Sequence, residues 1–382
     1  MPDEATNPFR FGALALDDAF TDREAEIAEL KSDTRNGQDV VVFAPRRYGK
    51  SSLVWRVAQE LVSEGVLVTQ LDLMTTPTKE KLAEKLAKAI HDDVASPLFR
   101  ARERLNVFRG LRITPIVTVD PADGSLAFTF QAGRTRADVD ATLEHLLELP
   151  GRLGAERGRK VALVLDEFQE VVTVDRDLPK LMRAVFQAQP EVAHLYLGSK
   201  RHLMDRIFND ENEPFWRSAK LMELGVIEPH VFRGYVSERF RKTGRNVAEA
   251  AVDRVLAITR GHPYATQELC YFLWEQTAAG TLAGNEHVAR ALESVLRSEY
   301  AHFSLVWDKA ATAQRLLLQA LAAEPGRPLR GDYRSRHGLP TASSVQRALE
   351  ALVQGELVAR EEEGGYRIVE PFLAEWIRLR DG

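Results

Sequence analysis

The sequence predicts an α/β domain built on a parallel sheet with helices on both faces, followed by a helical lid and a C-terminal winged helix-turn-helix. Up to Glu228, short strands that are apolar throughout alternate with helical repeats, as expected of a parallel sheet buried on both faces. After Glu228 the strand patterns stop and helical periods take over. The expected domains are therefore 1–228, 229–308 and 309–382.

Composition limits the classes of function. The chain has 382 residues, 45% of them hydrophobic, and a formal net charge of -5. Its length suits two or three domains with apolar cores, and its charge gives no general attraction to nucleic acid or acidic membranes. The single cysteine, Cys270, excludes an intramolecular disulfide and a multi-cysteine zinc site. We expect a cytoplasmic protein with no membrane partner, since no secretory signal and no membrane-length apolar stretch is visible.

The first strand and helix enclose a loop. Asp39–Ala44 (DVVVFA) is a short β-branched run, and apolar residues recur with helical spacing from Ser51. A second strand is predicted at Val66–Leu73. Thr76-Pro77 predicts the N-cap and first turn of a helix that ends at about His91.

Residues 96–135 are irregular and are interpreted as an insertion. A basic stretch opens it, and strands at Ile113–Val119 and Leu126–Gln131 flank Asp123-Gly124, which predicts a hairpin. The basic stretch is interpreted as a solvated helix face. Its arginines are Arg100, Arg102, Arg104, Arg109 and Arg112.

The remaining elements complete the predicted architecture. A helix at Asp138–Leu149 leads through a glycine-rich segment, 151–158, into the apolar strand Val161–Leu165. Further strands are predicted at His194–Leu197 and Lys220–Val226. The helical periods that follow are Val231–Lys242, Ala248–Thr259, Ala265–Ala278 and His287–Glu299. The winged helix is predicted from helices at Ala313–Ala322, Asp332–His337 and Ala342–Gln354 and strands around Leu357–Arg360 and Tyr366–Val369.

The loop after the first strand fits a phosphate-binding pattern. It reads Ala44-Pro45-Arg46-Arg47-Tyr48-Gly49-Lys50-Ser51-Ser52, which matches GxxxxGK[ST] except that alanine replaces the first glycine. In such a loop, backbone N–H groups converge on phosphate and Gly49 permits close approach. Lys50 neutralises the terminal phosphates and Ser51 ligates Mg²⁺. The alternative is a chance Gly-Lys-Ser, which the position between a buried strand and a helix disfavours.

Two adjacent carboxylates end the strand Val161–Leu165. Asp166 and Glu167 come at its carboxyl end, where open α/β sheets bind ligands. We expect Asp166 to hold Mg²⁺ and Glu167 to orient or deprotonate an attacking water. The alternative is an ordinary strand end with two acids, which the phosphate-binding loop upstream disfavours.

Together these motifs resemble the AAA+-related, archaeal-type ATPases of the STAND group of switch ATPases. Phe20–Glu26 resembles the N-terminal hhGRExE box that lies beside adenine in that group, with Asp22 in place of glycine and Arg23 as the matching arginine. Gly261-His262-Pro263 resembles the GxP motif of the helical lid, and Tyr366–Phe372 resembles the winged-helix ending. The resemblance spans nearly the whole chain and implies ATP and Mg²⁺ as cofactors.

The resemblance also implies further site residues. Ser199 stands where the family's sensor contacts the γ-phosphate, and Lys200 or Arg201 could share that role. Arg217 precedes the last sheet strand, where AAA+ relatives carry an arginine finger that acts on a neighbouring subunit. This implies self-association, with a solvated surface arginine as the alternative. Pro263 is carried over from the GxP motif, whereas His262 is equally a helix cap or a nucleotide sensor.

The winged helix carries mixed signals for DNA binding. Its basic residues are Arg327, Arg330, Arg334, Arg336 and Arg347, and its polar candidates are Thr341, Ser343, Ser344 and Gln346. Against DNA, Glu361–Glu363 place three acids in the wing, where they would repel phosphates. The alternative is a winged helix that contacts protein or inhibits its own chain.

Three functions stay open on the sequence. The leading one is an ATP-binding and ATP-hydrolysing switch, in which the lid and winged helix respond to nucleotide state. ATP is favoured over GTP by the resemblance and because no NKxD guanine signature follows the loop. The alternatives are a DNA-binding regulator controlled by ATP and a scaffold that holds nucleotide without hydrolysis. No effector domain or repeat sensor is visible, so a protein partner is expected to act in trans.

Overall fold

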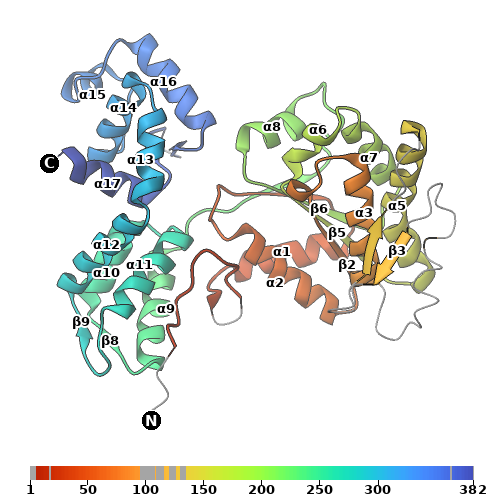
Figure 1. Cartoon of the computed structure of the whole chain (residues 1–382), viewed down its shortest axis with the longest axis horizontal. Coiled ribbons are helices and arrows are strands. Elements are labelled where there is room, and N and C mark those ends of the chain that lie inside the picture. Colours follow the sequence, from red (N-terminus) through yellow and green to blue (C-terminus); the bar gives the residue numbers. More distant parts are fainter. Residues whose placement is uncertain are drawn as a thin grey trace. The chain divides into compact units, whose positions relative to one another are not determined.

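The computed structural model describes residues 6–16, 19–94, 108, 116–119, 126–129, 135–361 and 364–381. By its contacts the chain divides into two compact units. The sheet unit comprises Arg23–Arg46 and Lys50–Leu224, and the helical unit comprises Met1–Asp22, Arg47–Gly49 and Gly225–Gly382. Figure 1 shows the elements of each unit. None of the described helices combines the length and apolar character that crossing a membrane requires.

Five parallel strands form the sheet, in the order β2-β5-β6-β1-β7. They are β1 (Val40–Phe43), β2 (Leu67–Asp72), β5 (Val161–Asp166), β6 (Val192–Gly198) and β7 (Lys220–Glu223). The connections that leave β1 and β6 run in opposite directions, so the strand order reverses between these neighbours. Open α/β sheets bind ligands beside such a reversal, at the carboxyl ends of the strands. The predicted parallel sheet is thereby confirmed.

Helices cover both faces of the sheet (Figure 1). Helices α1 (Glu24–Arg35) and α2 (Lys50–Ser63) pack on one face, and α3 (Lys79–Ala89), α5 (Arg136–Arg157) and α7 (Leu178–Gln187) group on the other. Along β1, Val41 and Phe43 enter the core on the side of α3 and α5. Val40 and Val42 point the other way and are also fully buried. This burial on both sides explains why the strand is apolar at every position.

Shorter elements complete the sheet unit. They are η2 (Leu73–Thr75), η3 (Ile90–Val94), β3 (Ile116–Val119), β4 (Leu126–Thr129), η4 (Phe168–Glu170), α6 (Val171–Val174) and α8 (Arg201–Asn209). Strands β3 and β4 pair antiparallel, which confirms the hairpin. Its turn at Asp123-Gly124 and the arginines of the basic stretch lie outside the described residues.

The start of α3 corrects the prediction. Thr78 is the N-cap, because its hydroxyl accepts a hydrogen bond from the backbone N–H of Lys81. Thr76 instead follows the turn η2, and its hydroxyl donates to the carbonyl of Leu73. The Asp72 side chain caps that turn at Met74. Thr76 therefore ends the turn, and the helix begins two residues later than the sequence pattern indicated.

Helix α5 is longer than predicted. It continues through Pro150 and the glycine-rich segment and ends at Gly158, which has the left-handed φ of 62°. Its internal glycines serve packing. A Cβ at Gly151 would overlap the side chain of Gln189, and one at Gly154 would overlap that of Val161. These glycines let the helix approach its neighbours closely, and they do not form a loop.

The helical unit begins with five helices and a small sheet. The helices are α9 (Pro229–Lys242), α10 (Glu249–Thr259), α11 (Pro263–Glu275), α12 (Asn285–Ser298) and α13 (Tyr300–Lys309). The prediction that strands stop after Glu228 is wrong, because β8 (Asn246–Val247) and β9 (Leu282–Ala283) pair in parallel. Phe9 and Cys270 are buried in the core of this unit. Burial raises the pKa of the Cys270 thiol.

The winged helix forms the end of the helical unit. It consists of α14 (Thr312–Ala323), α15 (Gly331–Arg336), α16 (Ala342–Gln354), β10 (Val358–Arg360), β11 (Tyr366–Ile368) and α17 (Pro371–Asp381). Strands β10 and β11 pair antiparallel and make the wing. The predicted winged helix is confirmed, and α17 is an addition that the sequence pattern had not indicated.

Candidate nucleotide site

The first turn of α2 and the end of β5 bring opposite charges together in the sheet unit. Lys50 is only 6% exposed, and its Nζ lies 3.4 Å from Glu167 Oε1 and 3.6 Å from Asp166 Oδ1. The hydroxyl of Ser51 donates a hydrogen bond of 3.1 Å to Asp166 Oδ2. The structure thus joins the two sequence motifs, which lie more than a hundred residues apart, into one cluster.

Glu167 is held in an uncommon conformation. Its φ of 50° and ψ of 47° are left-handed, which costs a non-glycine residue about 1–2 kcal/mol. The side chain accepts hydrogen bonds from Ser199 Oγ, at 2.9 Å, and from the amide of Gln169. Burial alone would raise the pKa of Glu167, but Lys50 and these two donors outweigh it, so its pKa lies below the ordinary value. Glu167 is therefore an ionised acceptor at neutral pH.

Two neighbours of this cluster were missed by the sequence reasoning. Asp72 ends β2 directly beside Asp166, which ends β5. Burial, together with the charges on Asp166 and Glu167, raises the pKa of Asp72. The signal for Asp72 was present, because parallel strands that both end in aspartate bring the two carboxyls to one edge. Gln169 had no such signal, since it reaches Glu167 only through the turn at η4.

The phosphate-binding loop lies between β1 and α2. Ala44, in the place of the usual glycine, is fully buried, and its backbone N–H donates to the carbonyl of Gly198 at 3.3 Å. Pro45 is half-buried, Arg46 is exposed, and Ser52 is buried in α2. Gly49 has a φ of 84°, and no atom lies within 4 Å of the place that a Cβ would take. Open space therefore adjoins the backbone at Gly49.

Two loop residues have their contacts within the helical unit. Arg47 Nη1 lies 3.7 Å from Glu370 Oε2, and its guanidinium lies 4.3 Å from the ring centroid of Tyr264. The Tyr48 ring meets the His262 ring edge-on with centroids 4.6 Å apart. The Tyr48 hydroxyl accepts a hydrogen bond of 3.3 Å from Arg367.

The residues after β6 have different surroundings. Ser199 reaches Glu167 and so belongs to the cluster. Lys200 Nζ pairs with Glu170 Oε1 at 2.9 Å, and Arg201 pairs with Glu223. Arg217 is exposed, and in the described part of the chain no carboxylate pairs with it. Its guanidinium lies 5.4 Å from the ring centroid of Trp216.

The motif residues of the N-terminal box and of α11 make local contacts. Arg23, 7% exposed, pairs with Glu26 at 2.8 Å. His262 is the N-cap of α11, where its Nδ1 accepts a hydrogen bond of 3.3 Å from Ala265 N, and Pro263 opens the helix. Burial, followed by the charges on Arg367 and Arg47, lowers the pKa of His262 to about 3. The His262 ring is therefore neutral, as its capping bond requires.

The cluster fits a magnesium–nucleotide complex by its chemistry. The hydroxyl of Ser51 and the carboxylate of Asp166 are the hard oxygen donors that Mg²⁺ prefers, and their hydrogen bond shows that they face the same point. Lys50 is a buried cation that pairs with the carboxylates of Asp166 and Glu167. A terminal phosphate can take the place of those carboxylates, because it carries the same sign of charge.

Comparison with known proteins shows the family of the chain. The model of a family described as an ATPase domain predominantly from Archaea matches residues 20–269. The chain belongs to this family of archaeal-type ATPases. A second model, described as a probable winged helix domain, matches residues 301–379. The resemblance to archaeal-type ATPases is thereby confirmed. No curated protein matches the chain significantly by sequence.

Two solved structures share the fold of this ATPase. A Walker-type ATPase of Pyrococcus abyssi is 17% identical with a TM-score of 0.65, and the match covers 95% of this chain and 97% of that one. The ORC2 protein of Aeropyrum pernix, solved in ADPNP–ADP complexes, is 14% identical with a TM-score of 0.54, over 94% of this chain and 93% of that one. At these identities the likeness shows the fold alone, a P-loop NTPase sheet with a C-terminal winged helix.

Proposed function

We propose that this chain binds MgATP and hydrolyses it at the carboxyl edge of the sheet. The observation that carries the proposal is the cluster in which Lys50 and Ser51 meet Asp166 and Glu167. Membership of the archaeal-type ATPase family supports a nucleoside triphosphate as the ligand. The missing guanine signature and the resemblance to the STAND group support ATP over GTP.

The residues of the cluster have separable roles in this proposal. Ser51 and Asp166 would hold Mg²⁺, which would offset negative charge on the phosphates. Lys50 would contact the terminal phosphates and so give up its contact with Glu167. Because Lys50 depresses the pKa of Glu167, this exchange would make Glu167 a stronger base when substrate is bound. Ser199 would keep Glu167 positioned to orient a water and take its proton.

The rest of the nucleotide site follows the family resemblance. Residues 44–52 would surround the phosphates with backbone N–H groups. Arg23 and Pro263 would lie on the adenine side. We further propose that residues 229–308 act as a lid and residues 309–382 as a winged helix whose positions depend on the nucleotide, as in STAND switches. A protein partner in trans would read that state.

The decisive experiment measures MgATP binding by calorimetry and turnover by phosphate release. Lys50→Ala removes the cation that the motif places on the terminal phosphates, so we expect binding and turnover to be lost. Lys88→Ala, which removes an exposed lysine of α3, is the matched control and should behave as wild type. Unchanged affinity of Lys50→Ala would refute the assignment of the phosphate site.

A second candidate function is DNA binding through the winged helix. It is favoured by the exposed polar face at the start of α16, where Thr341, Ser343, Gln346 and Arg347 all reach solvent. Arg336 is less suited, because it pairs with Glu324 at 3.4 Å. Of the acids expected in the wing, Glu361 lies 3.5 Å from Arg367, and the other two lie outside the described residues.

The two functions can be separated by salt dependence. Binding through phosphate contacts weakens steeply with salt. If the winged helix binds duplex DNA, the affinity should fall as the salt concentration rises. Arg347→Ala should then reduce both the affinity and its dependence on salt. Duplex binding that is absent, or that Arg347→Ala leaves unchanged, would exclude this face while leaving the ATPase proposal untouched.

A further inference from the structure

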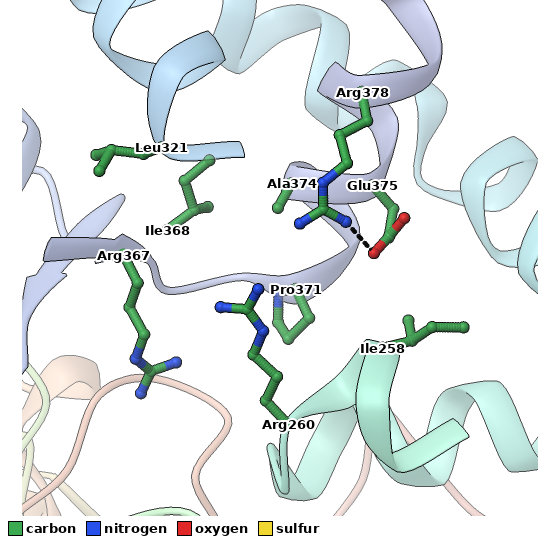
Figure 2. Close-up of a pocket in the computed structure, with 9 residues that line it drawn as sticks. All are labelled: Ile258, Arg260, Leu321, Arg367, Ile368, Pro371, Ala374, Glu375 and Arg378. Atoms are coloured by element: carbon green, nitrogen blue, oxygen red, sulfur yellow. Dashed lines mark hydrogen bonds and ion pairs between the residues drawn. The ribbon is translucent and has the colours of Figure 1, made fainter. Parts of the chain in front are cut away.

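A pocket in the helical unit is lined by arginines from two segments. It measures about 310 Å³, including space open to solvent, and lies where the end of α10 meets α14, β11 and α17. Arg260 contributes from the α10 side, and Arg367 and Arg378 contribute from the winged helix. Figure 2 shows these side chains with Glu375, the one carboxylate among the described residues that line the pocket.

Arg260 is the unusual residue of the three. It caps the C-terminus of α10 with a left-handed φ of 51° and ψ of 37°, a conformation that usually selects glycine or asparagine. Its guanidinium makes no hydrogen bond or ion pair with any described residue. Burial lowers the pKa of Arg260, and the charges on Arg378 and Arg367 lower it further. Glu361 and Glu375 offset part of this effect, and Arg260 itself is exposed to solvent. The chain thus places a cation without a direct partner at the mouth of a pocket lined by two further arginines.

Arg378 faces Arg260 across the pocket. Its Nε donates a hydrogen bond of 2.5 Å to the carbonyl of Ala322, and its Nη1 pairs with Glu375. Figure 2 shows Arg260 and Arg378 extending toward each other from opposite sides, whereas the guanidinium of Arg367 points away from both. Like charges repel each other, and Glu375 directly pairs only with Arg378, so an anion between the two guanidinium groups would stabilise Arg260 as well.

We propose that this pocket binds a phosphate group of a small molecule, held between Arg260 and Arg378. Guanidinium groups present paired N–H donors that match phosphate oxygens in a two-pronged contact. Such a ligand would join α10 to α17 and so hold the two segments of the helical unit together. The proposal does not depend on ATP hydrolysis at the sheet.

A simpler account of Arg260 is that its charge favours the negative end of the α10 dipole. That account needs no ligand, so a binding measurement separates the two. Arg260→Asn removes the charge while keeping a residue that tolerates positive φ. Arg254→Asn is the matched control, since Arg254 is an exposed arginine of α10 that does not line the pocket.

The experiment titrates inorganic pyrophosphate into full-length Lys50→Ala by calorimetry at low ionic strength. This background removes the competing phosphate site of the sheet unit. We expect saturable binding that Arg260→Asn weakens at least ~10-fold, as is usual when a charged hydrogen-bond donor is lost, and that Arg254→Asn leaves unchanged. Glu375→Gln should tighten binding, because it removes the carboxylate that occupies Arg378.

The outcomes decide both the site and the source of the phosphate. No pyrophosphate binding, or binding that Arg260→Asn and Glu375→Gln both leave unchanged, would overturn the proposal. Glu375→Gln also keeps the test valid if Arg260→Asn does not fold. Where pyrophosphate binds as expected, competition by ATP would identify a nucleotide as the source of the phosphate. Binding without competition would identify a separate phosphate compound.

Discussion

Two glutamates, Glu167 in the sheet unit and Glu268 in the helical unit, have opposite surroundings. In the sheet unit, Lys50 and Ser199 contact Glu167, and the pKa of Glu167 lies below its ordinary value. In the helical unit, Glu268 is fully buried and neither of its carboxyl oxygens has a hydrogen-bond partner. Burial, and then the charges on Glu299 and Glu370, raise the pKa of Glu268 to about 8.

This difference bears on the proposed hydrolysis. An ionised carboxylate held by donors can accept a proton as soon as its cation moves away, whereas a carboxyl that is protonated at neutral pH cannot. The comparison therefore favours Glu167 over Glu268 as the proposed base, and it predicts that substitutions in the two units will have different consequences.

Arg217 belongs to the sheet unit but, unlike Glu167, has no partner of opposite charge among the described residues. Its substitution has the largest expected effect on turnover. Its guanidinium is exposed and has no carboxylate partner in the part of the chain that the structure describes. If it acts on the nucleotide of a neighbouring subunit, specific activity should rise with protein concentration, and Arg217→Ala should lower turnover by about 10³-fold or more.

Mixing variants tests the same prediction independently. Arg217→Ala and Lys50→Ala each lack what the other supplies, so a mixture should recover part of the turnover. If activity is independent of concentration and Arg217→Ala matches wild type, the arginine acts only at the surface. Lys200 or Arg201 would then be the remaining cations for the γ-phosphate.

The next largest effect concerns Glu167, the paired carboxylate of the sheet unit. Glu167→Gln keeps the shape of the side chain but removes its negative charge. We expect MgATP to remain bound while hydrolysis slows by at least ~10²-fold, the usual scale for loss of a positioned base. Single-turnover phosphate release measures this directly. Glu191→Gln, at an exposed glutamate, is the control, and wild-type turnover of Glu167→Gln would place the base elsewhere.

Glu268, the unpaired carboxyl group of the helical unit, should make the free energy of unfolding depend on pH. The folded pKa of Glu268, about 8, lies above the ordinary value of 4.5, so the folded state binds the proton more tightly. The free energy of unfolding should therefore fall as the pH rises from about 4.5 to 8. Glu268→Gln should remove this slope.

The same variant should also stabilise the protein at pH 8. The expected gain is roughly 1–3 kcal/mol, because glutamine cannot ionise and so avoids the cost of a negative charge in the core. Urea unfolding at several pH values measures both effects, with Glu293→Gln at an exposed position of α12 as the control. Equal pH profiles for wild type and Glu268→Gln would contradict the raised pKa.

The smallest effect tests a neutral hydrogen bond in the sheet unit. Thr78→Ala removes the cap of α3 and should lower the free energy of unfolding by about 1 kcal/mol. Thr78→Ser keeps the hydroxyl and should restore most of it. Equal losses for both variants would show that the methyl group, and not the cap, stabilises this turn.

The sequence sufficed for the elements whose signals are local. The apolar run at β1, the loop after it and the acids after β5 are contiguous patterns, and parallel topology then brings Lys50 to Asp166 and Glu167. The local signal gave a wrong prediction for glycine, because glycine occurs both in loops and where helices pack closely. Gly151 and Gly154 read as a loop, but they serve close packing of α5 against its neighbours.

Residues whose importance comes from packing could not be predicted. Glu268 is one of several polar residues of α11, and only the assembled core shows that its carboxyl lacks partners. Arg260 likewise reads as a surface arginine until α17 brings Arg378 toward it. Both depend on contacts between segments that are distant in the chain, which periodicity and spacing do not encode.

Cys270 makes this protein convenient to label. It is the chain's single cysteine, and its thiol is buried with a raised pKa, so thiolate-directed reagents will react with it only when the core opens. A cysteine introduced at an exposed position would therefore carry a fluorophore or spin label without removal of the native one. Pairs of such probes, one in each unit, can follow the distance between the units through a nucleotide cycle.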